Sequence, residues 1–238
     1  MCTISLVFNS DENPGFVLTS NRDEAPGRET LSPNFYTVKN SRLLFPKDAV
    51  AGGTWIGISA NKRVVCLMNG GFQKHIRAEK YRVSRGVVVK DILAAKDPLV
   101  ELNSYNFQGI EPFTLILGDW NREFYFYELV WDGAKPHLKK LRLKNHIWSS
   151  SPLYSSEMKK LREAWFEEFQ QKKNLTSESL WDFHHSGGVG NKNVDLIMDR
   201  GFIKTKSITQ IIKTSEKTSM IYEDLQKKEI SEKDFEIT

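Results

Sequence analysis

The chain has 238 residues, of which 39% are hydrophobic and 27% are charged, and this composition is typical of a globular protein. The net charge of +4 comes from charges of alternating sign without a basic block, which argues against a nucleic-acid partner. The length fits a single domain over residues 1–238 with a sizeable core. We expect the charged residues from about position 224 onward to form a frayed tail.

Three features that the sequence lacks help to predict the cellular compartment of the protein. No apolar run approaches the roughly 18 residues that span a bilayer, so we expect no membrane span. The N-terminal sequence has neither a basic leader nor a cleavage site, which predicts no signal peptide. The cysteines are Cys2 and Cys66, too few for a disulfide framework, and we therefore expect a reducing, cytoplasmic location. Nothing in the sequence indicates an oligomeric state.

Strand patterns dominate the first half. Residues 2–8 alternate with the period of a half-buried strand and are expected to pair with residues 16–21 around a turn at 11–15. Residues 24–46 are polar and interrupted by prolines, which predicts a long surface loop. The next predicted strands are residues 55–59 and 63–69.

The second half mixes helices with strands. Residues 84–96 predict a helix that Ser84 caps and Pro98 ends. Residues 155–173 predict the clearest helix, and its apolar stripe consists of Met158, Leu161, Trp165 and Phe169. A shorter helix is expected at 176–185. The remaining predicted strands are 113–119, 123–130, 138–148, 203–213 and 218–223. Clustered strands with intervening helices indicate an α+β fold.

Cys2 is the sharpest chemical feature. Removal of Met1 would leave one residue that carries both a thiol and an α-amine with a pKa of about 7.7–8.0. That amine can take the thiol proton near neutral pH, which is the base-and-nucleophile pair of an N-terminal nucleophile. From position alone, a small buried residue at the start of a strand is the commoner explanation of Cys2.

Arg22 and Asp23 come at the end of the strand expected to pair with the Cys2 strand. In a regular hairpin they lie beside the N-terminus, where Arg22 would lower the thiol pKa and Asp23 would hold the α-ammonium group. The alternative is a solvated, salt-bridged turn.

Two further segments are candidates for binding. The glycines at 52–57 permit close backbone approach or positive φ, and Trp55 either packs in the core or lines a pocket. Asn69 follows a predicted strand, where its amide could donate to an oxyanion, although a turn asparagine is the commoner case. We assign Asn21, Gly53 and Trp55 as candidate ligand-binding residues. The side chains of the adjacent His184 and His185 would diverge on a helix, so we expect no metal site, and Cys66 is expected in the core.

These residues together resemble the NRDE family, also called the transport and Golgi organization family. The matching segments are Met1-Cys2, Asn21-Arg22-Asp23-Glu24, Gly52-Gly53-Thr54-Trp55-Ile56-Gly57, Asn69, Arg85-Gly86 and Pro112-Phe113-Thr114-Leu115-Ile116. The resemblance implies an αββα four-layer sandwich of N-terminal-nucleophile hydrolase type, similar to choloylglycine hydrolases and penicillin V acylases.

The resemblance also implies roles for individual residues. Cys2 matches the nucleophile, Arg22 and Asp23 fall near the residues that flank it, and Asn69 falls near the oxyanion asparagine. Ser150 stands where those hydrolases carry an asparagine, and Lys206 stands where the family carries an arginine. Serine is shorter than asparagine, and lysine lacks the planar fork of arginine.

Two functions remain open on these grounds, beside a structural or interaction role without chemistry in a pocket. The first is an amidohydrolase or acyltransferase that acts on a small-molecule amide or thioester without a cofactor. The second is a non-catalytic carrier of a hydrophobic ligand, haem or lipid, on the same fold. Haem would need a ligand such as Cys2, His184 or His185.

Overall fold

The computed structural model describes residues 2–9 and 15–235, with the backbone alone described for Cys2 and Asn9. Met1 and residues 11–14 of the predicted turn lie outside the described residues. The chain divides into a first unit, residues 1–28 and 144–236, and a second unit, residues 29–143 with 237–238. The single domain expected over residues 1–238 stays a prediction.

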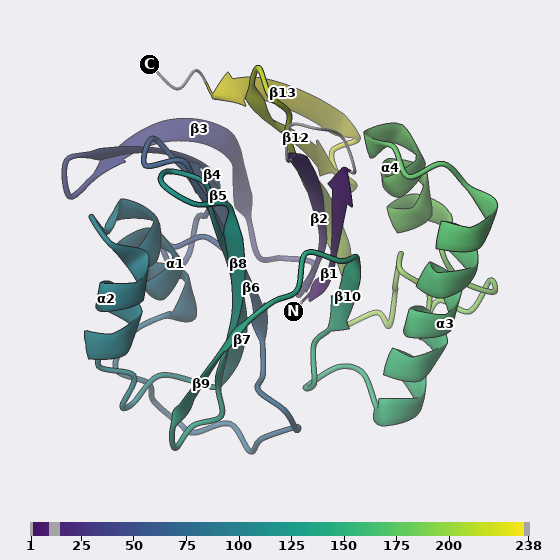
Figure 1. Ribbon diagram of the computed structural model, residues 1–238. Coiled ribbons are helices and arrows are strands. Elements are labelled where there is room, and N and C mark those ends of the chain that lie inside the picture. Colours follow the sequence, from purple (N-terminus) through teal and green to yellow (C-terminus); the bar gives the residue numbers. More distant parts are fainter. Residues whose placement is uncertain (1, 10–14, 236–238) are drawn as a thin grey trace. The chain divides into compact units, whose positions relative to one another are not determined.

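The first unit is built on an antiparallel sheet with the strand order β10-β1-β2-β11-β12-β13 (Figure 1). Its strands are β1 (Cys2–Asn9), β2 (Gly15–Glu24), β10 (His146–Ser149), β11 (Lys204–Lys213), β12 (Thr218–Asp224) and β13 (Glu229–Phe235). The predicted pairing of the first two strands is confirmed, because Leu6 stands opposite Leu18 and Cys2 opposite Arg22.

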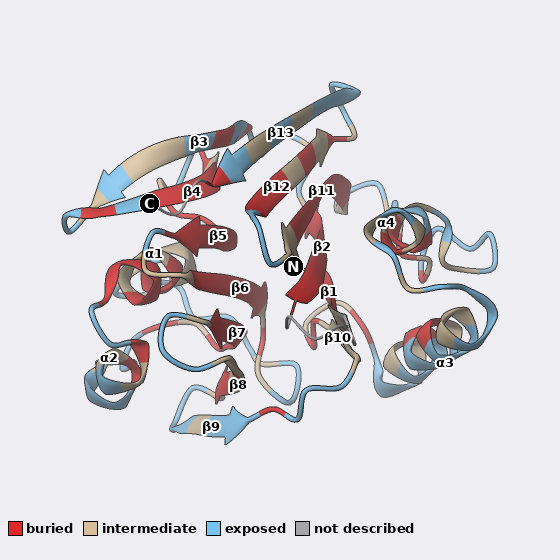
Figure 2. Cartoon of the chain, turned by 45° about the horizontal axis from the view of Figure 1, so that its top comes forward, coloured by how far each residue is buried: buried red, intermediate tan, exposed pale blue. Residues whose placement is uncertain are grey.

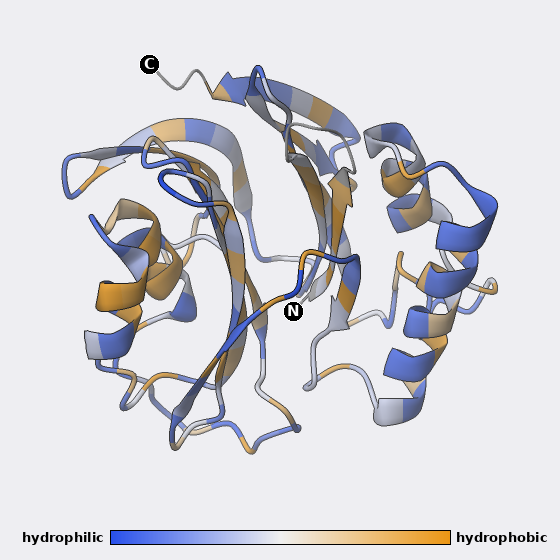
Figure 3. Ribbon diagram, in the orientation of Figure 1, coloured by the Kyte–Doolittle hydropathy of each residue, from blue (hydrophilic) through white to orange (hydrophobic). Residues whose placement is uncertain are grey.

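Helices α3 (Ser156–Lys172) and α4 (Ser177–Ser186) cover one face of this sheet. Both begin where the sequence predicts, and each has a capping residue: Ser155 accepts from the backbone of Met158, and Thr176 forms a capping box with Ser179. Hydrophilic residues cover much of α3 (Figure 3). The core below the helices consists of Val7, Val17, Phe166, Leu180, Phe183 and Leu196.

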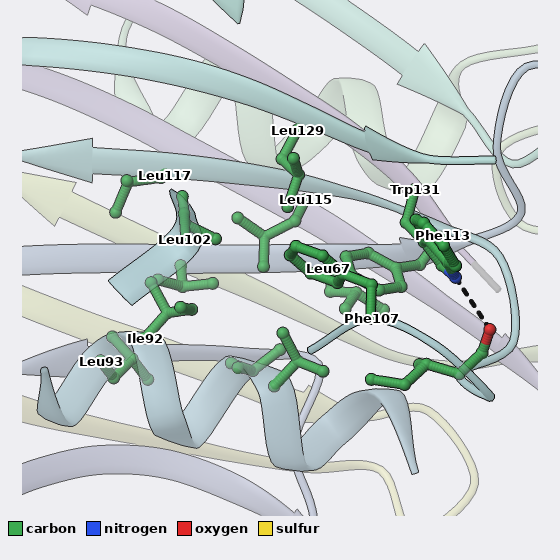
Figure 4. Packing of buried hydrophobic residues seen from close by; sticks show 14 of the residues in the cluster. Leu67, Ile92, Leu93, Leu102, Phe107, Phe113, Leu115, Leu117, Leu129 and Trp131 are labelled. Carbon is green, nitrogen blue, oxygen red and sulfur yellow. Dashed lines mark hydrogen bonds between the residues drawn. The ribbon is translucent and has the colours of Figure 1, made fainter. Parts of the chain in front are cut away.

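The second unit has an antiparallel sheet in the order β3-β4-β5-β6-β7-β8-β9. Its strands are β3 (Thr30–Val38), β4 (Ser41–Asp48), β5 (Ile56–Ser59), β6 (Arg63–Asn69), β7 (Phe113–Asp119), β8 (Tyr125–Trp131) and β9 (Pro136–Lys140). Helices α1 (Arg85–Ala94) and α2 (Pro98–Ser104) lie on one side of it, and α1 contacts β5 and β6. Leucines and aromatic rings fill the space between α1 and the sheet, and Trp131 Nε1 donates to the Ile110 carbonyl at 2.8 Å (Figure 4).

Arg63 ties α1 to the sheet. Its side chain is fully buried, and Nε donates to Asp119 Oδ2 at 2.8 Å. Its Nη1 donates to the carbonyls of Ile92 and Ala95 at 2.8 and 2.7 Å. These carbonyls belong to the last turn of α1, which has no partners for them within the helix. Arg63 therefore satisfies carbonyl groups at the end of the helix, and its own charge is paired with that of Asp119.

The loop predicted at residues 24–46 is wrong, because β3 and β4 occupy most of it. The prolines suggested a loop, but Pro33 falls at a register shift between Leu31 and Asn34 in the edge strand β3. A proline is tolerated there because no ladder hydrogen bond needs its missing N–H.

Three further boundaries differ from the prediction. Pro98 opens α2 as its first residue, because Asp97 caps this second helix. The strand predicted at 138–148 is two strands, β9 and β10, which belong to different sheets. The charged tail forms β13, whose alternating exposed and half-buried residues suit an edge strand (Figure 2).

Candidate functional site

The ends of neighbouring strands in the first unit bring several predicted residues together. Cys2 is the first residue of β1 and stands opposite Arg22 of β2, which in turn stands opposite Ser207 of β11. Residues directly opposite in a sheet carry their side chains on the same face. The backbone nitrogen of Cys2 lies on the Asp23 side of this row, because β1 and β2 run in opposite directions. The Cys2 side chain lies outside the described residues.

Arg22 supplies a positive charge in this row. Its side chain is 4% exposed, and its Nη2 lies 3.8 Å from Glu24 Oε2, a loose ion pair. A guanidinium next to a thiol lowers the thiol pKa because it stabilises the thiolate. The effect on the Cys2 thiol that the sequence suggests for Arg22 stays a prediction.

Asp23 is fully buried and held from two directions. Tyr154 donates to Oδ2 at 2.6 Å, and Thr205 donates to Oδ1 at 2.7 Å. Burial raises the pKa of Asp23, while the hydrogen bond from Tyr154 and the charge of Arg162 act in the opposite direction. Burial also raises the pKa of Tyr154 well above its usual value, so its hydroxyl remains a donor.

Arg162 of α3 supports the start of β1 from the helix-covered face. It is fully buried, donates to Thr3 Oγ1 at 2.5 Å, and donates to the carbonyls of Val194 and Asp195 at 2.9 and 2.6 Å. Its guanidinium lies 3.6 Å from the ring centre of Tyr154. Thr3 follows Cys2 directly, so Arg162 fixes the backbone that carries the candidate nucleophile.

Sequence reasoning missed Tyr154 and Arg162. Arg162 lies four residues from Met158 and from Phe166, on the buried face of α3. A lone arginine between apolar residues at this spacing was the available signal. Leu161, which was predicted in the apolar stripe, is 47% exposed instead.

Asn21 anchors a buried network rather than the row that contains Cys2. Its Nδ2 donates to the carbonyls of His184 and Leu196 at 3.0 and 2.9 Å. Both amide hydrogens therefore point to carbonyls, so Oδ1 must accept from His184 Nδ1 at 2.6 Å. The other ring nitrogen, Nε2, then accepts from Ser5 at 2.7 Å.

The two adjacent histidines diverge, as the sequence predicts. Burial lowers the pKa of His184 to about 3, so the ring is neutral at physiological pH. His185 turns to the other side, where Nε2 lies 2.6 Å from Glu223 and Nδ1 lies 2.8 Å from the Trp181 carbonyl. Neither ring has a nitrogen available for a haem iron without breaking these contacts.

Lys206 and Ser150 lie near the ends of β11 and β10. Lys206 occupies the irregularity between Thr205 and Ser207, and its Nζ donates to the carbonyls of Pro26 and Arg28 at 2.7 Å each. Burial, together with the charge of Arg22, lowers the pKa of Lys206. Ser150 is buried, and its Oγ has no hydrogen-bond partner among the described residues.

The other predicted site residues belong to the second unit. Asn69 is the last residue of β6 and is half-buried, and Gly70 follows it with a φ of 88°. Trp55 is buried, and its carbonyl accepts from the backbone of Leu67 at 2.7 Å. Packing explains why residue 53 is a glycine, because a Cβ there would lie 2.9 Å from the backbone of Gly86. The roles predicted for Asn69, Trp55 and Gly53 stay predictions.

Comparison with known protein families identifies the chain. The family model described as Transport and Golgi organisation 2 matches residues 1–222. The chain belongs to the Transport and Golgi organisation 2 family. The family predicted from the combined segments is thereby confirmed. No curated protein matches the sequence.

Solved structures similar to this family member include an acylase, an amidase and a hydrolase. Penicillin V acylase from Agrobacterium tumefaciens has a TM-score of 0.56 and 12% identity, over 98% of this chain and 86% of that chain. The Caenorhabditis elegans ortholog of N-acylethanolamine-hydrolyzing acid amidase has a TM-score of 0.58 and 12% identity, over 88% and 92%. A variant of the conjugated bile acid hydrolase from Clostridium perfringens has a TM-score of 0.54 and 11% identity, over 98% and 92%.

At such identities the similarity establishes the fold. This member of the Transport and Golgi organisation 2 family has the N-terminal-nucleophile hydrolase fold predicted from its sequence. Among the described helices, none has the length and apolar character that a membrane crossing requires. In the same residues, no three histidine, cysteine or acidic side chains gather as possible metal ligands.

Proposed function

We propose that the protein hydrolyses or transfers the acyl group of a small linear amide or thioester, with Cys2 as an N-terminal nucleophile. The observation that carries this proposal is the strand register, which sets Cys2 opposite Arg22 and turns its backbone nitrogen toward Asp23. The names of the similar structures support an amide substrate, since they are acylases, amidases and hydrolases of conjugates.

The chemistry needs one group to move the proton. After Met1 is removed, the α-amine of Cys2 takes the thiol proton, and Sγ attacks the carbonyl carbon of the substrate. When the carbon–nitrogen bond breaks, the amine leaves with that proton and the acyl group remains as a thioester. Water, deprotonated by the same α-amine, then releases a carboxylic acid and restores the thiol. An acceptor amine in place of water gives acyl transfer.

Asp23 and Arg22 have separate tasks in this scheme. Asp23 holds the α-ammonium form of Cys2, and Arg22 favours the thiolate. Tyr154, Thr205 and Arg162 act as positioning residues, because they hold Asp23 and Thr3 and need not touch the substrate.

Ser150 is the proposed oxyanion donor. Among the described residues, its hydroxyl has no hydrogen-bond partner, which leaves it able to donate. The oxyanion role that the family resemblance implies for Asn69 stays a prediction. Loss of one oxyanion donor typically lowers kcat by about 10²–10³-fold. We expect Ser150→Ala to lower kcat by such a factor while Cys2 still reacts with an electrophile.

Turnover of short acyl anilides tests the proposed function. Three forms of the full chain are compared: the protein that starts at Cys2, the same protein with an uncleaved N-terminal extension, and Cys2→Ala. We expect aniline release from the first form alone, because the other two lack either the free α-amine or the thiol. Equal rates from all three forms would contradict the proposal.

The carrier function predicted as an alternative has a separate test. Haem bound through His184 would have to displace Ser5 or Asn21 from the ring nitrogens. A spectral titration with haem, repeated on Cys2→Ala, measures whether a thiolate ligand forms. A haem spectrum that depends on Cys2, without aniline release, would favour the carrier over the hydrolase.

A further inference from the structure

Three hydroxyl groups on β2 and β11 are buried without a hydrogen-bond partner among the described residues. They belong to Ser20 of β2 and to Ser207 and Thr209 of β11, whose residues are 0%, 1% and 0% exposed. Ser207 stands opposite Arg22, and Thr209 stands opposite Ser20. Since Cys2 also stands opposite Arg22, all three hydroxyls share the sheet face of Cys2.

The other face of the same strands is different. Its hydroxyls all have partners: Thr3 with Arg162, Ser5 with His184, Thr19 with Gln210, and Thr205 with Asp23. Buried polar groups in native proteins are normally satisfied, and those that are not need a water, an ion or a ligand as partner. The contrast between the two faces therefore indicates that the hydroxyls on the Cys2 face bind polar atoms of a molecule that is not part of the sheet.

The strand geometry gives the distance of these hydroxyls from Cys2. Ser20 and Thr209 form the row next to that of Cys2 and Arg22, because Ser20 also stands opposite Ile4. Successive residues on one face of a strand are about 6.6–6.8 Å apart. Ser20 is one strand from Cys2 and Thr209 is two strands from it, and neighbouring strands lie about 4.8 Å apart. A substrate with its carbonyl at Cys2 would therefore reach Ser20 at about 8 Å and Thr209 at about 12 Å.

The direction of β1 decides which part of the substrate lies over Ser20 and Thr209. The leaving amine must receive its proton from the α-amine of Cys2, which lies on the Asp23 side of the row. Ser20 and Thr209 lie on the opposite side of Cys2. The acyl part of the substrate therefore extends over them, and the leaving group points away.

We propose that Ser20 and Thr209 form an acyl-group subsite for a neutral hydroxyl, amide or ether oxygen about 8–10 Å from the scissile carbonyl, with Ser207 at its edge beside Arg22. The inference rests on the proposed function, because it takes the position of the carbonyl from Cys2. A neutral group fits because hydroxyls donate and accept without charge, whereas Arg22 in the next row would hold an anion. The substrate class is thus an amide of a hydroxylated or otherwise polar acyl chain, rather than of a plain fatty acid.

A matched pair of substrates tests the subsite. The wild-type chain, Ser20→Ala/Thr209→Val and Ser231→Ala are compared on hexanoyl anilide and ω-hydroxyhexanoyl anilide. Ser231 is the control because its hydroxyl also lacks a partner among the described residues, yet it lies in β13, two strands from Thr209. We expect the wild-type and Ser231→Ala chains to prefer the hydroxylated anilide about tenfold in kcat/KM, and the double variant to lose this preference.

Equal kcat/KM for the two anilides in the wild-type chain would overturn the subsite, as would a preference that survives in the double variant. If the wild-type chain hydrolyses neither anilide, calorimetric binding of the same pair separates the two proposals. Tighter binding of the hydroxylated anilide, lost in the double variant, would support the subsite while the proposed hydrolysis fails. Equal binding would overturn the subsite as well.

Discussion

Tyr154 contributes one hydroxyl to a fully buried carboxyl group, and this contact can be removed without changing the shape of the core. Tyr154→Phe deletes the donor to Asp23 Oδ2. Hydrogen bonds to charged groups contribute about 1.5–3 kcal/mol. We expect the free energy of unfolding in urea to fall by this amount.

The control for this substitution is Tyr36→Phe, whose ring stacks on Phe45 at 4.4 Å and keeps that contact. It should change the free energy of unfolding by less than about 0.5 kcal/mol. Equal effects of the two substitutions would show that the Tyr154 hydroxyl does not hold Asp23.

His184 makes the stability depend on pH. Its pKa is about 3 in the folded chain and 6.5 without the protein environment, so between these values the unfolded chain binds a proton that the folded chain does not. Stability from this group is complete above pH 6.5 and is lost as the pH falls toward 3. The slope is at most about 1.4 kcal/mol per pH unit.

His184→Gln removes this titration. Urea unfolding at several pH values should give a flatter profile for the variant than for the wild-type chain between pH 6.5 and 4. Other groups, Asp23 included, titrate in both proteins and cancel in the difference. Parallel profiles would contradict a neutral, buried His184.

At the level of elements, glycine allows the start of α1 to touch the segment before β5. A Cβ on Gly86 would lie 2.8 Å from the Thr54 nitrogen, and a Cβ on Gly53 would lie 2.9 Å from Gly86. Both neighbours are backbone atoms and cannot turn aside. We expect Gly86→Ala to lower the free energy of unfolding by about 1–3 kcal/mol.

Gly27→Ala is the matched control, because a Cβ there meets nothing within 4 Å. Thermal unfolding of both variants gives the comparison, and the control should remain close to the wild-type chain. If Gly86→Ala unfolds at the same temperature as the wild-type chain, the two segments can separate enough to accommodate the added methyl group.

The elements that were predicted correctly have strong local patterns. The helices at 155–173 and 176–185 carry caps and apolar stripes, and the hairpin of β1 and β2 shows strand alternation. β3 was missed because its proline and polar residues reflect an exposed edge strand, and β13 was missed for a similar reason. Local patterns describe exposure well, but they do not distinguish an exposed strand from a loop.

For the molecule as a whole, the family and fold followed from short motifs spread along the chain rather than from periodicity. The strand register then showed how the segment Asn21-Arg22-Asp23-Glu24 is arranged. Its alternate residues lie on opposite faces of one sheet. The contacts of Tyr154 with Asp23 and of Arg162 with Thr3 could not be predicted, because they join residues more than a hundred positions apart. Such contacts leave no local pattern.

The central claim is that Cys2 is an activated N-terminal thiol. Mass spectrometry after brief treatment of the full chain with α-chloroacetanilide tests it most directly, because the thiolate displaces chloride and keeps the label. Cys66 is the internal control, since it is the other cysteine of the chain and is fully buried.

We predict that Met1 is absent, that the peptide beginning at Cys2 carries the label while the Cys66 peptide does not, and that Arg22→Gln slows labelling. A chain that retains Met1, or a Cys2 that reacts no faster than cysteine in a short peptide, would contradict the claim.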